Sequence, residues 1–228
     1  MTLTKKFLRR YSNLPSLIHL LTKQSLTFLD PGNWDDKNDS LYMRLYKENK
    51  KLGTLLAVCF SQQTETYHHW SVFASGSSGV CISFRKEELL SNLNQWEGIR
   101  GRRVTYIPLD QLNETPKKVR DLPFMKRAPF KPESEYRVIY EERDKSRSYV
   151  NIEVPLDCID RIYLSPWMPR SIADSVKSAL KSIDAAADIE IVRSTLIDND
   201  RWAKFGKSVV GEIETSSHRP TRKKSENP

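Results

Sequence analysis

Two short, uninterrupted apolar runs limit most strongly what this chain can fold into. They are Thr54–Phe60 and Gly79–Phe84, and the first follows Gly53 while the second follows the turn Ser75-Gly76-Ser77-Ser78. Runs of this length between turn signals are typical of buried strands rather than of helices. We therefore expect both to be strands inside a sheet.

The rest of the chain alternates between helical and strand-like patterns. Apolar spacing predicts helices over Ser12–Lys23, from Asp39 or Ser40 to about Lys51, over Lys86–Trp96 and over Pro169–Ile183. Further strands are expected over 7–11, 25–29, 102–107, 135–141, 149–154, 159–164 and 189–192.

This order of elements predicts an α+β domain. Its central sheet is expected to be mixed and largely antiparallel, flanked by three or four helices. We expect one domain over residues 1–205. A basic, disordered tail is expected over 206–228, where the composition becomes polar and ends in HRPTRKKSENP.

Positive charge is concentrated in one part of the sequence. The formal net charge is +8, and between residues 99 and 131 nine basic residues face three acidic ones, a balance of +6. Such a stretch suits a phosphate-rich ligand or nucleic acid. A solvated loop region is the alternative explanation.

Cysteine usage and hydropathy predict a cytoplasmic protein. Cys59, Cys81 and Cys158 each lie in an apolar run without a CxxC pair, which indicates reduced, buried thiols and no zinc site. No stretch approaches the ~20 apolar residues that cross a membrane, and the N-terminus has no signal-peptide pattern. The acidic group Asp35, Asp36 and Asp39 is expected to be a turn and helix cap rather than a metal site.

Four stretches taken in order resemble a known family. They are Arg10-Tyr11 with the following helix and SLTFLDPGNWDDKND, then CFSQQTETYHHWSVFASGSSGVCISF, then FKPESEYRVIYE, and finally RIYLSPWMP before a helix. Together they resemble the bacterial domain-of-unknown-function 2971 family over about residues 5–195. The resemblance implies a fold class and carries no established activity.

A pair of glutamates stands out in the third of these stretches. Strand alternation is expected to place Glu133, Glu135 and Arg137 on one face, where Arg137 separates two carboxylates that would otherwise repel each other. A local glutamate–arginine cluster at the sheet surface is one explanation. The other is a catalytic Glu-x-Glu strand.

The second explanation rests on a resemblance in motif order to ADP-ribosyltransferases. These enzymes use an arginine or histidine on the first strand, a serine or tyrosine on a middle strand and a Glu-x-Glu or Gln-x-Glu strand. Here Arg10 lies on the first expected strand, Ser71 in the middle segment and Glu135 in the third. The resemblance implies NAD as a substrate, no metal, and a role in toxin activity or phage defence.

The resemblance also implies a role for each residue. Glu135 stabilises the positive charge that develops on the ribose, and Glu133 positions the acceptor. Arg10, with Tyr11 beside it, holds the phosphate, while Trp70 or Tyr136 stacks on the nicotinamide. The adjacent His68 and His69 are expected on an extended segment, as packing residues or a general base. The alternatives are a nucleic-acid-binding module, using residues 99–131, and a non-catalytic interaction module.

Overall fold

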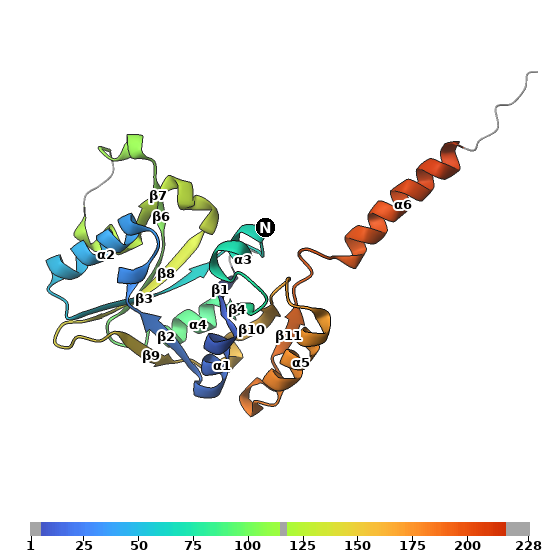
Figure 1. Ribbon diagram of the computed structural model, residues 1–228. Coiled ribbons are helices and arrows are strands. Elements are labelled where there is room, and N and C mark those ends of the chain that lie inside the picture. The colour runs from blue at the N-terminus through green and yellow to red at the C-terminus, as the bar shows by residue number, and fades with distance from the viewer. Residues whose placement is uncertain (1–5, 115–117, 218–228) are drawn as a thin grey trace, which may run out of the picture. The chain divides into compact units, whose positions relative to one another are not determined.

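The computed structural model describes residues 6–114 and 118–217, with side chains up to residue 210. The chain divides into two compact units, residues 1–194 and 195–228. Among the described residues, the first unit contains a nine-stranded sheet and five α-helices (Figure 1). The described part of the second unit contains the helix α6 (Asp200–Ser217).

The strands of the first unit are β1 (Phe7–Asn13), β2 (Ser25–Leu29), β3 (Thr54–Ser61), β4 (Gly79–Arg85), β5 (Ile99–Arg103), β6 (Thr105–Ile107), β7 (Met125–Arg127), β8 (Glu135–Glu142), β9 (Tyr149–Glu153), β10 (Ile159–Leu164) and β11 (Glu190–Arg193). Its α-helices are α1 (Leu14–Lys23), α2 (Lys37–Lys50), α3 (Tyr67–Phe73), α4 (Lys86–Leu93) and α5 (Arg170–Lys181). Two of its 3-10 helices, η4 (Val119–Phe124) and η5 (Ala128–Glu133), lie beside the site described below.

The sheet is mixed and mostly antiparallel, as the sequence predicts. Its strand order is β11-β10-β4-β1-β3-β2-β9, and β8 pairs with β3 on one side and β5 on the other. Within this sheet only β10 and β11 run parallel. The strands β6 and β7 form a separate parallel pair.

The sheet divides along one edge of β3. On the β8 side, β3 is paired from Thr54 to Ser61 without interruption. On its other side it meets β1 only where Arg9 pairs with Ser61, and β2 only where Leu29 pairs with Ala57. We call this interrupted edge the seam. It joins the β1–β4–β10–β11 part of the sheet to the β3–β8–β5 part (Figure 1).

Strand alternation sends side chains to two different cores. The even-numbered residues of β3, with Leu8 and Ile82, pack with helices α1, α4 and α5 in the larger core. The odd-numbered residues Leu55 and Ala57 pack against α2 on the opposite face. On that same face α3 covers Cys81 of β4 with Trp70. The candidate site lies on the α2 and α3 face.

Two expected local structures were wrong. His68 and His69 lie in helix α3 and not on an extended segment, because Thr66 caps the helix by accepting a hydrogen bond from the backbone of His69. Helix α2 begins earlier than predicted, because its N-cap is Asp36 and not Asp39 or Ser40. Asp39 is thereby released from capping and turns inward, where it is buried.

The strands expected over 135–141 and 149–154 are both present, but they are not partners. β9 pairs with β2, and β8 pairs with β3 and β5. The charged segment between them turns back over the start of β3, where the Thr54 side chain bonds the backbone at Lys145 and Arg147. That contact holds the segment before β9 against the start of β3.

Helix α6 carries large apolar side chains that are exposed. Trp202 is 75% exposed and Phe205 59%, and their rings lie 5.9 Å apart. Residues 206–217 of the expected tail are helical, and 218–228 lie outside the described residues. In the described part of the chain, no helix combines the length and hydropathy required to cross a bilayer.

Candidate functional site

Three polar residues form a row across neighbouring strands. Arg9 of β1 pairs with Ser61 at the end of β3, and Ser61 pairs with Glu135 at the start of β8. Residues paired in a sheet project to the same face. The register therefore places an arginine, a serine and a glutamate side by side on the α2 and α3 face, in the order of the motif.

Arg10 and Tyr136 project to the other face. Arg10 pairs with Ile82, and Tyr136 pairs with Phe60, and both of these partners belong to the larger core. Within the described residues no hydrogen bond or ion pair engages the Arg10 side chain, and burial lowers its pKa. The structure thus does not bring Arg10 and Glu135 to one side of the sheet.

The expected middle-strand residues lie in helix α3. Trp70 is fully buried and donates its indole N–H to Oε1 of Glu65 at 2.9 Å. The Tyr11 ring packs edge-on against Trp70, with ring centroids 5.4 Å apart. Ser71 is on the exposed side of the helix. Tyr11 and Trp70 therefore form part of the core beneath α3, and neither they nor Ser71 is joined to Glu135 by a described contact.

Glu135 is held by Arg137, whose guanidinium N–H groups are all hydrogen-bonded. Nε of Arg137 donates to Oε1 of Glu135 at 2.7 Å, and Nη2 to Oε2 at 3.0 Å. Asp39 of α2 accepts from Nη1 at 2.7 Å and from Nη2 at 2.6 Å. The carbonyl of Pro123 accepts from Nη1 at 2.9 Å. All five N–H groups of the guanidinium are thus used, and Trp34 covers its face, 4.6 Å away.

A lysine joins the same cluster to the second glutamate. Lys126 Nζ lies 2.7 Å from Glu133 Oε2, 3.5 Å from Glu135 Oε2 and 3.6 Å from Asp39 Oδ2. Glu133 belongs to η5, and Ser134 after it has a left-handed φ of 46°. The expectation that Glu133 shares a strand with Glu135 and Arg137 was therefore wrong. The cluster is also buried, and not at the sheet surface.

The two glutamates differ in acidity. Burial opposes ionisation of Glu135, but the charge and hydrogen bonds of Arg137 outweigh burial, so its pKa lies below the ordinary value. For Glu133 burial dominates over the favourable contact with Lys126, and its pKa is raised. The site therefore pairs a firmly ionised carboxylate with one that accepts a proton more readily.

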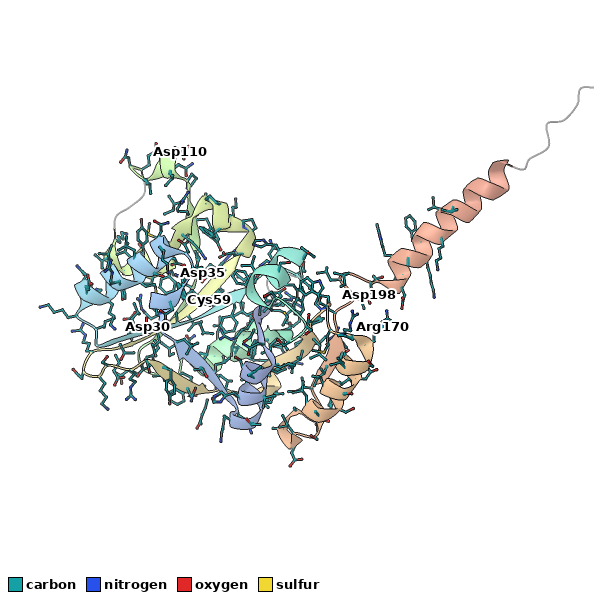
Figure 2. All side chains as sticks on the ribbon, in the orientation of Figure 1. Asp30, Asp35, Cys59, Asp110, Arg170 and Asp198 are labelled. Atoms are coloured by element: carbon teal, nitrogen blue, oxygen red, sulfur yellow. The ribbon has the colours of Figure 1, made fainter. Side chains whose placement is uncertain are left out.

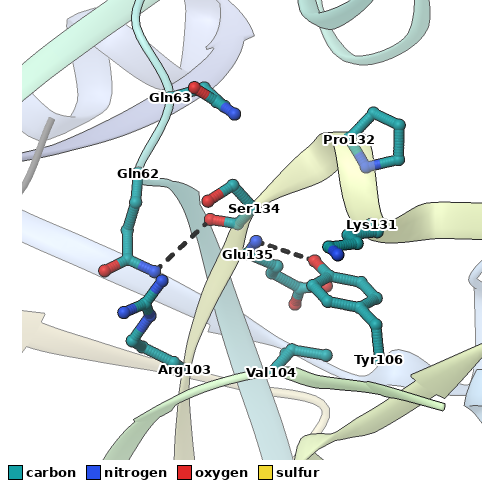
Figure 3. Close-up of a pocket in the computed structure, with 9 residues that line it drawn as sticks. All are labelled: Gln62, Gln63, Arg103, Val104, Tyr106, Lys131, Pro132, Ser134 and Glu135. Atoms are coloured by element: carbon teal, nitrogen blue, oxygen red, sulfur yellow. Dashed lines mark hydrogen bonds between the residues drawn. The ribbon is translucent and has the colours of Figure 1, made fainter. Parts of the chain in front are cut away.

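A pocket of about 390 Å³ opens at the β3, β5 and β8 edge of the sheet (Figure 3). Its lining residues are Gln62, Gln63, Arg103, Val104, Tyr106, Lys131, Pro132, Ser134 and Glu135. Tyr106 accepts a hydrogen bond from the backbone N–H of Glu135 at 2.8 Å, so its own proton is free for a ligand. Arg9 approaches this edge by donating from Nη1 to the carbonyl of Gln63 at 2.8 Å.

Ser61 and His69 form a buried polar contact that is structural. Ser61 Oγ donates to the carbonyl of Glu133 at 2.8 Å and lies 2.9 Å from His69 Nε2. His69 Nε2 also lies 3.1 Å from that carbonyl, so this nitrogen carries the proton, and Nδ1 faces the hydroxyl of Thr66 at 2.6 Å. A protonated Nε2 cannot activate Ser61. The contact ties β3 and α3 to the turn that carries both glutamates.

The basic stretch is partly neutralised. Arg100 pairs with Glu141 and Arg102 with Asp121, while Lys126 belongs to the buried cluster. Arg103 and Lys131 line the mouth of the pocket and are exposed. Of the nine cations expected there, Lys117 lies outside the described residues. Positive charge is thus available around the pocket, and also at the exposed Lys118, Arg120 and Arg127.

The described residues contain no cluster of three or more histidine, cysteine, aspartate or glutamate side chains that is suited to a metal. Asp36 caps α2, and Asp39 pairs with Arg137. All three cysteines are free thiols, and Cys59 is half-buried. Figure 2 shows Cys59 on β3. Burial raises the pKa of the Cys81 thiol to about 12, which leaves it protonated.

Comparison with known proteins gives one structural likeness. No family model matches the chain, so the resemblance to domain-of-unknown-function family 2971 is not confirmed, and no curated protein matches it. A solved structure of DarT from Thermus sp. 2.9, in complex with ADP-ribosylated single-stranded DNA, is similar with a TM-score of 0.43 and 8% identity. The alignment covers 83% of this chain and 94% of that one. A TM-score of this size supports no functional assignment. The function proposed below therefore rests on the geometry of the site.

Sequence reasoning missed Arg9 and Ser61. The signal for Ser61 was its place at the end of the apolar run of β3. That run predicts a strand more clearly than the segment around Ser71 does. The signal for Arg9 was the alternation Leu8, Arg9, Arg10, in which the apolar Leu8 faces the core. Arg9 then faces the opposite side, which Glu135 shares.

Proposed function

We propose that the pocket binds NAD and that the protein is an ADP-ribosyltransferase-like enzyme, which passes ADP-ribose to an acceptor or to water. The row of Arg9, Ser61 and Glu135 carries this proposal. It reproduces the arginine, serine and Glu-x-Glu order of such enzymes on three adjacent strands. The 390 Å³ volume lies in the range of small-molecule sites.

The chemistry requires a stable negative charge beside the ribose. The bond between the ribose C1′ and the nicotinamide nitrogen breaks, and its electron pair leaves with the nicotinamide. Positive charge develops on the ribose ring, and the ionised Glu135 stabilises it. The acceptor oxygen or nitrogen then bonds C1′ and loses its proton to bulk water, because Glu133 is buried and does not line the pocket.

The other pocket residues suit the rest of the dinucleotide. Arg103 and Lys131 are exposed cations at the pocket mouth and bind the pyrophosphate. Tyr106 donates its free hydroxyl proton to a ribose hydroxyl. Arg9 takes the phosphate role that the motif order assigns to Arg10, because Arg9 shares the face of Glu135.

The test is nicotinamide release from NAD by the purified protein, alone and with nucleic acid or cell-extract protein as acceptor. We expect release by the wild type, and a KM for NAD about tenfold higher in Arg9→Ala, because one phosphate contact is lost. The matched variant Arg10→Ala removes the same charge from the opposite face and should leave KM unchanged. Absence of both NAD binding and nicotinamide release would refute the proposal.

Nucleic acid is a second candidate partner, favoured by the two exposed cations at the pocket mouth. If it binds there, the logarithm of its affinity falls with the logarithm of salt concentration, and each phosphate contact contributes about 0.7–0.9 to the slope. We expect the double variant Arg103→Ala/Lys131→Ala to lower the slope for a single strand by about 1.4, or about 0.7 for each lost contact. Lys177→Ala on α5 is the control, and an equal slope in all three proteins would contradict binding at this edge.

A further inference from the structure

We infer that Arg137 is a positioning residue, anchored by Asp39, that keeps the Glu135 carboxylate charged and aimed at the pocket. This inference rests on the function proposed above, because it assigns to Glu135 the charge that the reaction needs. Arg137 does not line the pocket and touches no substrate. Its action on the reaction would pass through Glu135 alone.

The geometry leaves Arg137 a single orientation. Glu135 takes two of its hydrogen bonds, Asp39 takes two and the Pro123 carbonyl takes one. A guanidinium with every donor used cannot rotate without breaking several charge-assisted bonds. Both oxygens of Glu135 are therefore fixed on the side that faces Arg137. The Cys59 thiol and Lys126 also approach these oxygens, and Glu135 lines the pocket beside them.

Asp39 supplies the anchor from a distant part of the chain. It lies on α2, 98 positions from Arg137, and its side chain is 2% exposed. Its two carboxylate oxygens accept hydrogen bonds from Nη1 and Nη2 of Arg137. Nε, at the other end of the guanidinium, donates to Glu135. The position of the strand-borne carboxylate therefore depends on the packing of α2 against the sheet.

Stability alone does not explain this cluster. Arg137, Lys126, Asp39, Glu133 and Glu135 bring two positive and three negative charges to a place where no side chain is more than 10% exposed. Burying charges costs so much desolvation that well-packed apolar residues are often as stable or more stable. Perturbed acidities of this kind gather at functional sites.

Every element around Glu135 contributes a group that affects its charge. Arg137 and Lys126 favour the ionised form, while Asp39 and Glu133 oppose it as like charges. The Cys59 thiol bonds Glu135, and Tyr106 bonds its backbone N–H. Arg137 is the strongest of the favourable groups, so its removal should have the largest effect on the acidity of Glu135.

The experiment measures kcat and KM for nicotinamide release across pH in Arg137→Gln and Arg137→Lys. In the glutamine variant we expect the acid limb of the pH profile to move up by at least about one pH unit, because the main stabilising charge is gone. In the lysine variant the charge remains but the two-pronged fork is lost. We expect its acid limb to stay in place while kcat falls about tenfold with KM unchanged.

Two further proteins complete the design. Arg147→Gln breaks the exposed ion pair with Glu142 at the far end of β8. It should match the wild type in kcat and in the position of the acid limb of the pH profile. Asp39→Asn keeps Arg137 and the shape of its partner but weakens the anchor. We expect it to lower kcat about tenfold with KM unchanged, and this variant replaces Arg137→Gln if the latter does not fold.

The outcomes separate this inference from the proposed function. A wild type that releases nicotinamide, together with Arg137 variants that keep its acid limb and kcat, overturns the inference and leaves the proposed function intact. A wild type that binds and cleaves no NAD removes both. The positioning role is supported if the acid limb of the pH profile moves in Arg137→Gln and stays in place in Arg137→Lys. Replacing a purely structural residue would not produce this pair of results.

Discussion

Glu135→Gln is expected to reduce nicotinamide release from NAD about 10²–10³-fold at neutral pH, the usual effect of removing one well-placed electrostatic group. Glutamine keeps the size of the side chain and can still accept a hydrogen bond from Arg137, but it carries no charge. The loss should appear in kcat, because the positive charge on the ribose exists only in the transition state.

The matched control is Glu142→Gln, at the other end of the same strand. Glu142 pairs with Arg147 outside the pocket, and its replacement should leave kcat within about twofold, because an exposed ion pair contributes little. Thermal unfolding of both variants would show that each is folded at the assay temperature. A Glu135→Gln protein that cleaves NAD at the wild-type rate would remove Glu135 from the mechanism.

Asp39→Ala is expected to lower the free energy of unfolding by about 3–5 kcal/mol, the cost of leaving a buried charge without its partner. The guanidinium of Arg137 loses two charge-assisted hydrogen bonds and remains fully buried. Urea or thermal unfolding measures the loss. Asp36→Ala on the same helix is the control, because it removes only an N-cap and should cost about 1 kcal/mol.

The double variant Asp39→Ala/Arg137→Leu identifies the cause of that loss. If the cost comes from an unpaired charge, replacing Arg137 by an apolar residue should recover part of it. An additive loss in the double variant would mean that Asp39 stabilises the fold through other contacts.

The pH dependence of stability should follow Glu135. Its pKa is lower in the folded protein than in the unfolded chain, so its contribution is complete above the unfolded value of about 4.3 and is lost as the pH falls toward the folded value.

Much of the sheet was predictable from local pattern. The short apolar runs at β3 and β4 are strands whose residues are buried on both faces of the sheet. Gly53 and the Ser/Gly turn mark where the two runs begin. The partner of β9 was not predictable, because a local pattern does not say which strand lies beside another. In the structure β9 pairs with β2, and the Thr54 side chain bonds the backbone of Lys145 and Arg147 in the segment before β9.

The candidate site was predictable only in part. The Glu-x-Glu pattern drew attention to residues 133–135, but Ser134 turns the backbone between the two glutamates, so alternation fails there. The pairing of Asp39 with Arg137 spans 98 positions, and no local pattern in a single sequence indicates such a contact. The choice between Arg9 and Arg10 depended on which neighbour faces the core, and Leu8 decides it.

The seam along β3 has a mechanical consequence. Arg9 belongs to the part of the sheet that is built on β4, and Glu135 to the part that is built on β8, while a single residue pair joins β1 to β3. Few backbone hydrogen bonds hold the two halves together at this point. A molecule bound by both Arg9 and Glu135 would link the two parts of the sheet across the seam. Its binding free energy would therefore also oppose their separation.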